Sequence, residues 1–255
     1  PNTTTTYTVT ATDGNGCSNT DQVDVTVNTL PTISAGADQA ICAGDQVTIG
    51  TLSNLNNSLV AYYPFNGNSN DESGNSNDGV NNGASLTTDR FGNANSAYSL
   101  DGVNDYISVN DAQNLDGVDE MTISFWVNFS NAQPGTFTPI ISKWAGSAND
   151  PNSSYIISID NSFLQYTTDV NNNVGIYGQS YVNRSNNFSS NNWYHVVAQS
   201  NLNQYKLYID GSLVNTRNQV NLGIYNNNTQ LRFGEWYNRF FNGVLDDIGI
   251  WNRFL

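Results

Sequence analysis

Residues 121–129, MTISFWVNF, alternate between large apolar side chains and other side chains. One face of the extended chain carries Met121, Ile123, Phe125, Val127 and Phe129, and the other carries Thr122, Ser124, Trp126 and Asn128. This two-residue period predicts a strand with one face in a core. Tyr205, Leu207 and Ile209 repeat the pattern before an Asp210-Gly211 hairpin turn. No window keeps a 3.6-residue period over three turns, so we expect an all-β chain with almost no helix.

The composition agrees with a folded β protein. Hydrophobic residues make up 38% of the 255 residues and aromatic residues 12%, which is more than a disordered chain contains. Only 12% of the residues are charged. Polarity comes instead from Asn, Ser, Thr and Gly, which favour turns and exposed strand faces over helices.

The charge balance limits the partners. The formal net charge is −14 and the chain has 8 Lys and Arg residues, whereas phosphate binding needs clustered basic side chains, so we expect no nucleic-acid partner. No apolar run reaches the roughly 18 residues that span a bilayer. The sequence also shows no signal peptide and no initiator Met, and we expect it to be a piece of a longer secreted protein.

An oxygen-rich loop follows a predicted strand in residues 59–79, LVAYYPFNGNSNDESGNSNDG. The possible ligands in it are Asn66, Asn68, Asp71, Glu72, Ser73, Asn75, Asn77 and Asp78, separated by Gly67, Gly74 and Gly79. Calcium takes roughly six to eight oxygen ligands, and glycines let a chain curl around the ion. The loop therefore favours a calcium site. The alternative is a solvated turn without metal, because the same residue types are ordinary turn formers.

Further motifs stand in order along the chain. They are AYSLDGVNDYIS, MTISFWVNF, NWYHVVA, YKLYIDG and GVLDDIGIWNR. Together with the oxygen-rich loop, these motifs resemble those of laminin-G-like, concanavalin-A-like jelly-roll domains over residues 58–255. The resemblance implies two antiparallel sheets in a sandwich and a structural Ca²⁺. Its ligands would be Asp71 and Asn75 from the loop, with Asp246 or Asp247 from the terminal LDD motif.

The N-terminal region predicts a separate β element. Residues 3–28 alternate polar and β-forming residues around a DGNG turn, which is a hairpin signal. They resemble the closing strands of an immunoglobulin-like repeat in adhesins of gliding Bacteroidota, which are exported by type IX secretion. Residues 31–50 resemble the opening strands of the next repeat. The expected organisation is repeat strands over 1–50, a linker over 51–57 and the jelly roll over 58–255.

Two cysteines lie in this N-terminal region, at Cys17 and Cys42. In the repeats that the region resembles, a Cys near the opening strand pairs with one near the closing strand, a bond suited to an oxidising exterior. Each cysteine would then have its partner outside this sequence. A direct bond between Cys17 and Cys42 is the alternative, and it needs Cα atoms within about 7 Å.

The residue types needed for catalysis are scarce. His195 is the single histidine, so any Ser-His-Asp or Cys-His arrangement must use it, and one His with two separated Cys makes no usual zinc site. Glucanases of the jelly-roll shape carry two carboxylates in a Glu-x-Asp-x-x-Glu strand, and this spacing does not occur here. We therefore expect no enzyme.

Glycan binding needs only stacking aromatics beside polar side chains. Three segments supply that mixture, and from them we select Trp236, Tyr237, Arg239, Trp144 and Tyr181. The alternative is that these aromatics cover sheet edges. The leading prediction is a non-catalytic module of a secreted cell-surface adhesin that binds polysaccharide or a cell-surface glycan and contacts the secretion machinery during export. A spacer or protein-interaction domain without sugar binding, or an accessory domain of a polysaccharide-degrading enzyme, is the alternative.

Overall fold

The computed structural model describes the following residues: 4–25, 57–117, 119–130, 137–145, 153–160, 163–169, 179–185, 188–218, 224 and 227–255. For residue 169 and for 179–185 it describes the backbone alone. The chain divides into two compact units, Pro1–Asn54 and Leu55–Leu255. The division falls inside the predicted linker.

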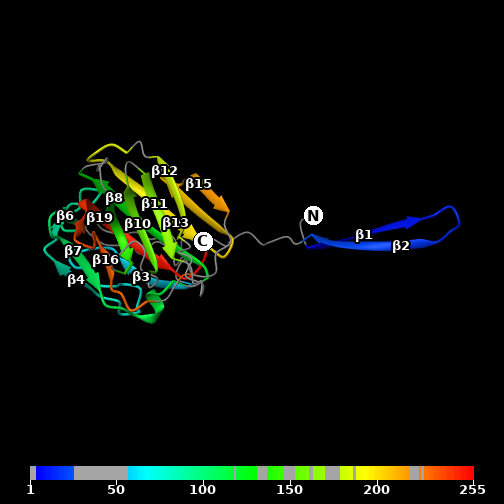
Figure 1. The fold of residues 1–255 in the computed structure, drawn as a ribbon, viewed down its shortest axis with the longest axis horizontal. Coiled ribbons are helices and arrows are strands. Elements are labelled where there is room, and N and C mark those ends of the chain that lie inside the picture. Colours follow the sequence, from blue (N-terminus) through cyan, green and yellow to red (C-terminus); the bar gives the residue numbers. More distant parts are fainter. Residues whose placement is uncertain are drawn as a thin grey trace, which may run out of the picture. The chain divides into compact units, whose positions relative to one another are not determined.

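The first unit contains a hairpin of β1 (Thr5–Thr12) and β2 (Ser18–Val25) (Figure 1). Tyr7 lies opposite Val23 across the strands, as the alternation in the sequence indicates. Cys17 is exposed. Cys42, residues 51–56 of the predicted linker and the predicted opening strands of the next repeat lie outside the described residues, so the immunoglobulin-like assignment and both disulfide alternatives stay predictions.

The second unit is a sandwich of two antiparallel sheets (Figure 1). The seven-stranded sheet has the order β12 (Gln179–Ser185), β11 (Phe163–Asp169), β10 (Tyr155–Asp160), β9 (Thr138–Lys143), β16 (Leu231–Phe233), β7 (Tyr106–Val109), β4 (Gly79–Asn82). The eight-stranded sheet has the order β15 (Ser212–Asn218), β14 (Gln204–Ile209), β13 (Trp193–Ser200), β8 (Met121–Phe129), β19 (Asn242–Trp251), β6 (Ala97–Asp101), β5 (Ser85–Thr87), and β3 (Leu59–Tyr63) also pairs with β19. A two-stranded ribbon joins β17 (Glu235–Trp236) to β18 (Arg239–Phe240).

This architecture confirms the predicted all-β sandwich. The described residues contain a single helical element, the 3₁₀ turn η1 (Gln113–Leu115). The last strand pairs with the first strand of the unit, with Ile248 opposite Tyr63. No helix among the described residues is long and apolar enough to cross a membrane.

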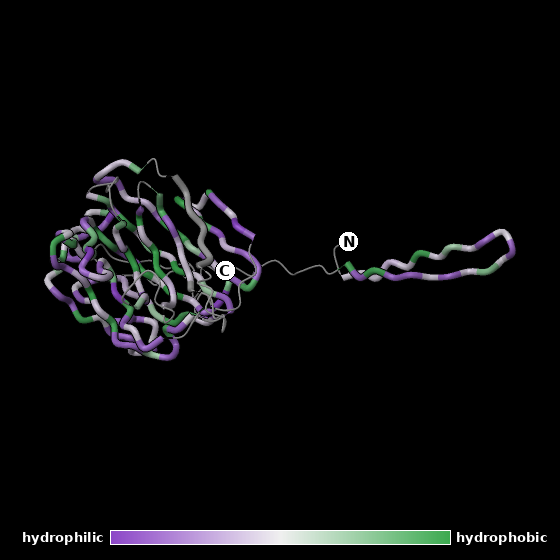
Figure 2. Tube along the Cα trace, in the orientation of Figure 1, coloured by the Kyte–Doolittle hydropathy of each residue, from purple (hydrophilic) through white to green (hydrophobic). Residues whose placement is uncertain are grey.

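The core fills the space between the two sheets. The five alternate apolar residues of β8, from Met121 to Phe129, are all fully buried, as the two-residue period predicted. Aromatic edge-to-face contacts tie the sheets together, because the Phe233 ring of β16 lies 4.9 Å from the Tyr63 ring of β3 and 6.2 Å from the ring of Phe65, which follows β3. Figure 2 shows apolar residues along the strands of this unit and hydrophilic residues in its loops.

Strand β19 changes face in its middle. Leu245 points into the core, and so do Ile248 and Ile250, although strict alternation from Leu245 would place residues 247, 249 and 251 there instead. The change occurs at a β-bulge between Asp246 and Gly249, where Asp247 takes a left-handed backbone with φ 46°. A bulge inserts one extra residue and re-aims the side chains beside it. Asp246 and Asp247 therefore both project from the outer face of the sheet.

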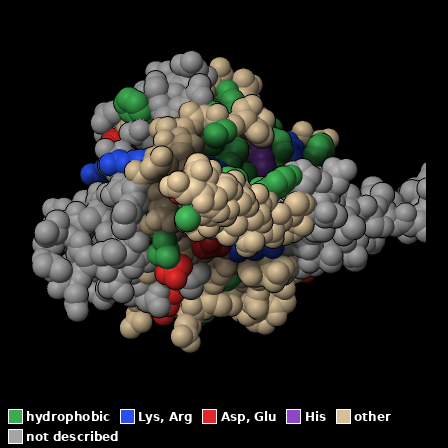
Figure 3. All heavy atoms as spheres, turned by 90° about the vertical axis from the view of Figure 1, so that its right-hand side faces the viewer, with side chains coloured by type: hydrophobic (Ala, Val, Ile, Leu, Met, Phe, Trp, Pro, Cys, Tyr) green, Lys and Arg blue, Asp and Glu red, His purple; other side chains and the backbone are tan. Residues whose placement is uncertain are grey.

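That outer face is not purely polar. Trp126, His195 and Trp251 project from it and are partly exposed. Figure 3 shows the single histidine of the chain at the surface, with hydrophobic side chains on either side of it.

Candidate functional site

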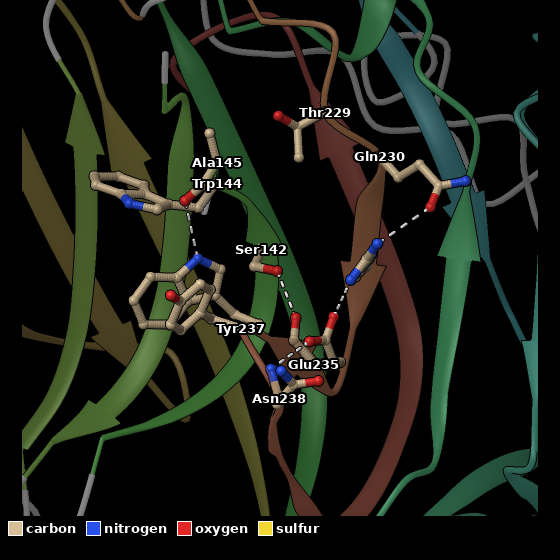
Figure 4. Close-up of a pocket in the computed structure, with 10 residues that line it drawn as sticks. Ser142, Trp144, Ala145, Thr229, Gln230, Glu235, Tyr237 and Asn238 are labelled. Atoms are coloured by element: carbon tan, nitrogen blue, oxygen red, sulfur yellow. Dashed lines mark hydrogen bonds and ion pairs between the residues drawn. The ribbon is translucent and has the colours of Figure 1, made fainter. Parts of the chain in front are cut away.

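A tryptophan pair stands on the outer face of the seven-stranded sheet. Trp144 follows β9 and Trp236 lies in β17, and with Ile156 of β10 they form an apolar cluster separate from the main core. The Trp236 indole Nε1 donates a hydrogen bond of 3.2 Å to the Ala145 carbonyl (Figure 4). The Phe137 ring packs edge-on against Trp236 at 5.2 Å. The pair is therefore fixed in place by its neighbours and is largely buried.

Two hollows share this tryptophan pair. The first, of about 340 Å³, is lined by Ser142, Trp144, Ala145, Thr229, Gln230, Arg232, Glu235, Trp236, Tyr237 and Asn238 (Figure 4). The second, of about 290 Å³, is lined by Phe137, Trp144, Ile156, Asp160, Gln165, Thr167, Trp236 and Arg239. The two tryptophans thus form a ridge between adjacent hollows, each near the lower end of the volumes typical of small-ligand pockets.

Tyr237 and Arg239 give the ridge its exposed groups. Tyr237 is 63% exposed and its ring centroid lies 5.8 Å from that of Trp236. Its backbone is left-handed, with φ 52°, in the tight turn that joins β17 to β18. The Arg239 guanidinium lies 5.7 Å from the Phe137 ring and 6.0 Å from the Trp236 ring. Tyr237 therefore offers an open aromatic face, and Arg239 offers hydrogen-bond donors beside it.

The structure brings four of the five predicted glycan-binding residues together: Trp144, Trp236, Tyr237 and Arg239. Tyr181 belongs to β12, where its backbone pairs with Thr167, a residue that lines the second hollow. The side chain of Tyr181 lies outside the described part of the chain.

Sequence reasoning missed the polar side of the first hollow. Arg232 forms a short ion pair with Glu235, and Glu235 accepts a 2.9 Å hydrogen bond from the Asn238 amide (Figure 4). The i, i+3 spacing of Arg232 and Glu235 was the available signal. This spacing did not predict the ion pair, because an i, i+3 spacing implies side-chain contact only within a helix. Here the two residues lie on different short strands, β16 and β17.

A buried lysine supports the same hollow from below. The Lys143 side chain is fully buried, and its Nζ lies 2.6 Å from Asp111 Oδ1 and 3.0 Å from Asp116 Oδ1. It also donates hydrogen bonds of 2.9 Å to the carbonyls of Asn227 and Thr229. A buried charge is tolerated when several partners satisfy it. Lys143 therefore holds the segment that carries Thr229 and Gln230 against the ridge.

The oxygen-rich loop is closed by its own hydrogen bonds. Asp71 Oδ1 accepts from the backbone amides of Tyr62 and Ser73, each at 2.9 Å, and Oδ2 accepts from the Asn77 amide at 3.0 Å and the Ser73 hydroxyl at 2.9 Å. Asn75 presents its side-chain N–H groups, donating to the carbonyls of Leu59 and Val60 at 3.0 Å. Both predicted loop ligands thus serve the loop backbone.

The terminal acidic pair has a different partner, Arg90. The guanidinium lies 2.7 Å from Asp246 Oδ2 and 2.7 Å from Asp247 Oδ2, so it bridges the two carboxylates. Asp247 Oδ1 also accepts a 2.8 Å hydrogen bond from the Tyr62 hydroxyl. Burial and the neighbouring Asp247 charge raise the pKa of Asp246 to about 7, because together they outweigh the opposite effect of Arg90.

These contacts do not fit one calcium ion shared by the loop ligands and either terminal aspartate. Asp71 accepts from the backbone amide of Tyr62, whereas Asp247 accepts from the hydroxyl at the far end of the Tyr62 side chain, and the Arg90 guanidinium bridges Asp246 and Asp247. Among the described residues, no group of three or more His, Cys, Asp or Glu side chains is placed to hold a metal ion. Calcium binding by this chain stays a prediction from the sequence.

His195 lies in β13 on the outer face of the other sheet. Its Nε2 is 2.8 Å from the Ser124 hydroxyl, and its ring stacks on Trp126 at 5.0 Å. Asp210 accepts a hydrogen bond from the backbone amide of His195 and not from the imidazole. Burial lowers the pKa of the imidazole. Among the described residues no carboxylate orients the ring, as a Ser-His-Asp triad requires.

Comparison with known proteins places the chain in a family. The family model for the concanavalin A-like lectin/glucanases superfamily matches residues 101–255, so the chain belongs to that family. The family name covers both lectins and glucanases. A sequence search of curated proteins finds no match.

Several solved structures have the same fold. A structure described as botulinum neurotoxin type C, whose cell entry depends on two ganglioside molecules, is 20% identical with a TM-score of 0.62, over 80% of this chain and 50% of that one. The botulinum neurotoxin DC binding domain in complex with rat synaptotagmin II is 21% identical with a TM-score of 0.62, over 78% and 49%. The serotype D ligand-binding domain with N-acetylneuraminic acid is 17% identical with a TM-score of 0.62, over 80% and 49%. This chain spans about half the length of these proteins, and at such identities the likeness concerns the fold alone.

Proposed function

We propose that the jelly-roll unit is a non-catalytic carbohydrate-binding module, and that its binding site is the tryptophan ridge with its two hollows. The observation that carries this proposal is the convergence of Trp144, Trp236, Tyr237 and Arg239 on one outer face. Sugar rings present C–H faces to aromatic rings and hydroxyls to polar side chains, and this ridge offers both.

The ridge supports a division of roles among these residues. Trp236 is 9% exposed and its indole N–H is already used, so it shapes the walls of both hollows. Tyr237 supplies the exposed stacking surface, and Arg239 supplies donors at the edge of the second hollow. Because two hollows lie on either side of one ridge, an oligosaccharide of at least two rings fits the site better than a single sugar.

The test is binding of the whole chain to a glycan array, followed by Tyr237→Ala. We expect the variant to weaken binding of the captured glycan by at least about tenfold, which corresponds to about 1.4 kcal/mol and lies within the range for one aromatic contact. Tyr7→Ala in β1 is the matched control, because Tyr7 is an exposed tyrosine of the other unit. An array without any captured glycan, or equal binding by the Tyr237 variant, contradicts the proposal.

The wider setting forms the second part of the proposal. We infer a secreted cell-surface adhesin in which the hairpin belongs to a stalk of immunoglobulin-like repeats and the jelly roll attaches the cell to polysaccharide. The acidic net charge of −14 and the family membership support this setting. Detection of the protein on intact cells by antibody labelling, with loss of attachment to the array-identified glycan on deletion of its gene, tests it.

A further inference from the structure

A third hollow lies on the outer face of the eight-stranded sheet, remote in the sandwich from the tryptophan ridge because the core separates the two sheets. Its volume is about 310 Å³, and it is lined by Leu59, Tyr62, Ser124, Trp126, His195, Asp247, Gly249 and Trp251. These residues come from β3, β8, β13 and β19. None of them belongs to the proposed ridge site.

The floor of this hollow consists of small residues. Gly249 lies opposite Ser124 of β8 on one side and opposite Tyr62 of β3 on the other. A Cβ on Gly249 would stand 2.3 Å from the Cη2 atom of Trp251, so the indole of Trp251 occupies the space that a larger residue would need. Residue 249 therefore has to be a glycine for the Trp251 indole to pack against the strand at this position.

Aromatic rings form the walls. The Trp126 and His195 rings stack at 5.0 Å with an interplanar angle of 28°, Trp251 stands at the other end, and Tyr62 closes a third side. The Ser124 hydroxyl is held by His195 Nε2 at 2.8 Å, and the Tyr62 hydroxyl is held by Asp247 at 2.8 Å. Polar atoms are therefore fixed in position at the rim of an aromatic hollow, as in small-ligand sites.

The β-bulge adds a second, independent observation. Asp247 keeps a left-handed backbone, with φ 46°, in the middle of a long strand, and its carboxylate lines the hollow. Non-glycine residues in this conformation cost free energy and cluster at functional sites, and bulges often re-aim a side chain beside one. Without the bulge, Asp247 would point to the core and leave the hollow.

The charges around the hollow indicate a neutral ligand. Arg90 bridges Asp246 and Asp247 at 2.7 Å each, and its guanidinium also lies 4.5 Å from the Trp126 ring. The Arg90 guanidinium already occupies the face of Trp126 and would repel a cationic ligand there. The Asp247 carboxylate would repel an anionic ligand. The remaining groups, a neutral imidazole and two hydroxyls, suit a hydroxyl-bearing molecule.

We propose that this hollow is a second ligand site, which binds one neutral sugar ring against Trp126 and Trp251 through hydrogen bonds to Asp247, His195 and the Ser124 hydroxyl. The site would be separate from the ridge and would take a terminal or single pyranose in its volume of about 310 Å³.

The single histidine makes the test direct. Because the chain has one His, its imidazole C–H resonances in an NMR spectrum report this hollow without assignment of the rest of the chain. The probes are methyl glycosides of glucose, galactose and mannose at millimolar concentration, with glucuronate and choline as charged comparators. We expect a saturable shift of the histidine resonances with at least one methyl glycoside, and affinities at least about tenfold weaker for glucuronate and choline.

Two variants locate the effect. Trp126→Leu keeps apolar cover over the sheet and removes the indole, so the shift should require at least about tenfold more sugar, with folding checked by thermal melting. Tyr237→Ala should leave the titration unchanged, which keeps this result distinct from the fate of the ridge proposal. The inference is overturned if no methyl glycoside moves the resonances, if choline or glucuronate binds more tightly, or if Tyr237→Ala abolishes the shift while Trp126→Leu keeps it.

Discussion

Asp246 is a buried acid whose proton affinity differs between the folded and unfolded chain. Its pKa is about 7 in the folded protein, against 3.8 for an ordinary aspartate, because burial and Asp247 disfavour its charge. Between these values the folded state binds more protons than the unfolded state, so the free energy of unfolding falls as the pH rises through this window. Stability from this residue is fully present below about pH 4 and lost above about pH 7.

We therefore expect the wild type to lose stability relative to Asp246→Asn as the pH is raised from 5 to 8, by an amount on the order of a few kcal/mol. Melting curves of both proteins across this range measure the difference. His195, whose pKa is lowered by burial, contributes the opposite trend, but it is present in both proteins and cancels. If the stabilities of the two proteins change in parallel with pH, the pKa of Asp246 is not raised, and the effect of Arg90 on it outweighs that of burial.

Asp71 holds the loop after β3 through four hydrogen bonds, three of them from backbone amides. Asp71→Asn replaces an acceptor oxygen by a donor, and we expect it to destabilise the fold by about 1–3 kcal/mol. The loss should appear in thermal melting with a metal chelator present. Glu72→Gln, an exposed neighbour with the same change in charge, is the control. The contrary outcome is that wild type and Asp71→Asn have equal melting temperatures in chelator and differ only when Ca²⁺ is added. That result would show that Asp71 stabilises the fold by binding a calcium ion.

At the scale of single elements, the sequence pattern predicted the strands but not the irregularities within them. The alternation in residues 121–129 predicted β8 and its buried face, and Asp210-Gly211 forms the predicted turn with φ values of 48° and 75°. The LDD motif of β19 gave no sign of a bulge, because two adjacent aspartates fit a regular strand end equally well. Their partner Arg90 stands 156 residues before Asp246, a distance at which composition carries no pairing signal.

The packing of Trp251 on Gly249 gives a prediction for β19. Gly249→Ala places a Cβ 2.3 Å from the indole, so we expect Trp251 to move, with a change in tryptophan fluorescence and a loss of about 1–3 kcal/mol from strain in a packed site. Gly14→Ala is the matched control, because its Cβ would meet no atom within 4 Å and its φ is not positive. An unchanged emission spectrum and melting temperature in Gly249→Ala would contradict this packing.

At the scale of the whole molecule, the resemblance carried by the ordered motifs predicted the two-sheet sandwich. The ridge residues were also identifiable, because Trp, Tyr and Arg gather within residues 236–239. The third hollow was not predicted, since its floor and walls come from four strands spread between residues 59 and 251. Such a site exists only after the sheet has assembled.

Sugar sites on the outer faces of both sheets would make one molecule bivalent. We expect the monomer fraction of the protein to agglutinate beads that carry both the array-identified glycan and the methyl glycoside sugar found by NMR, because a second contact raises avidity without raising either affinity. Tyr237→Ala and Trp126→Leu should each abolish agglutination while retaining one kind of binding in solution. Agglutination that survives both single variants would contradict bivalency through these faces.

The bulge at Asp247 also absorbs one extra residue in the last strand. Leu245 and Ile248 are three residues apart, so a regular strand would place them on opposite faces, whereas the bulge lets both enter the core. Deleting Asp247 would restore regular alternation and keep Ile248 and Ile250 in the core, but it would remove a carboxylate that Arg90 and Tyr62 contact. The extra residue therefore serves the outer face of the sheet and not the core.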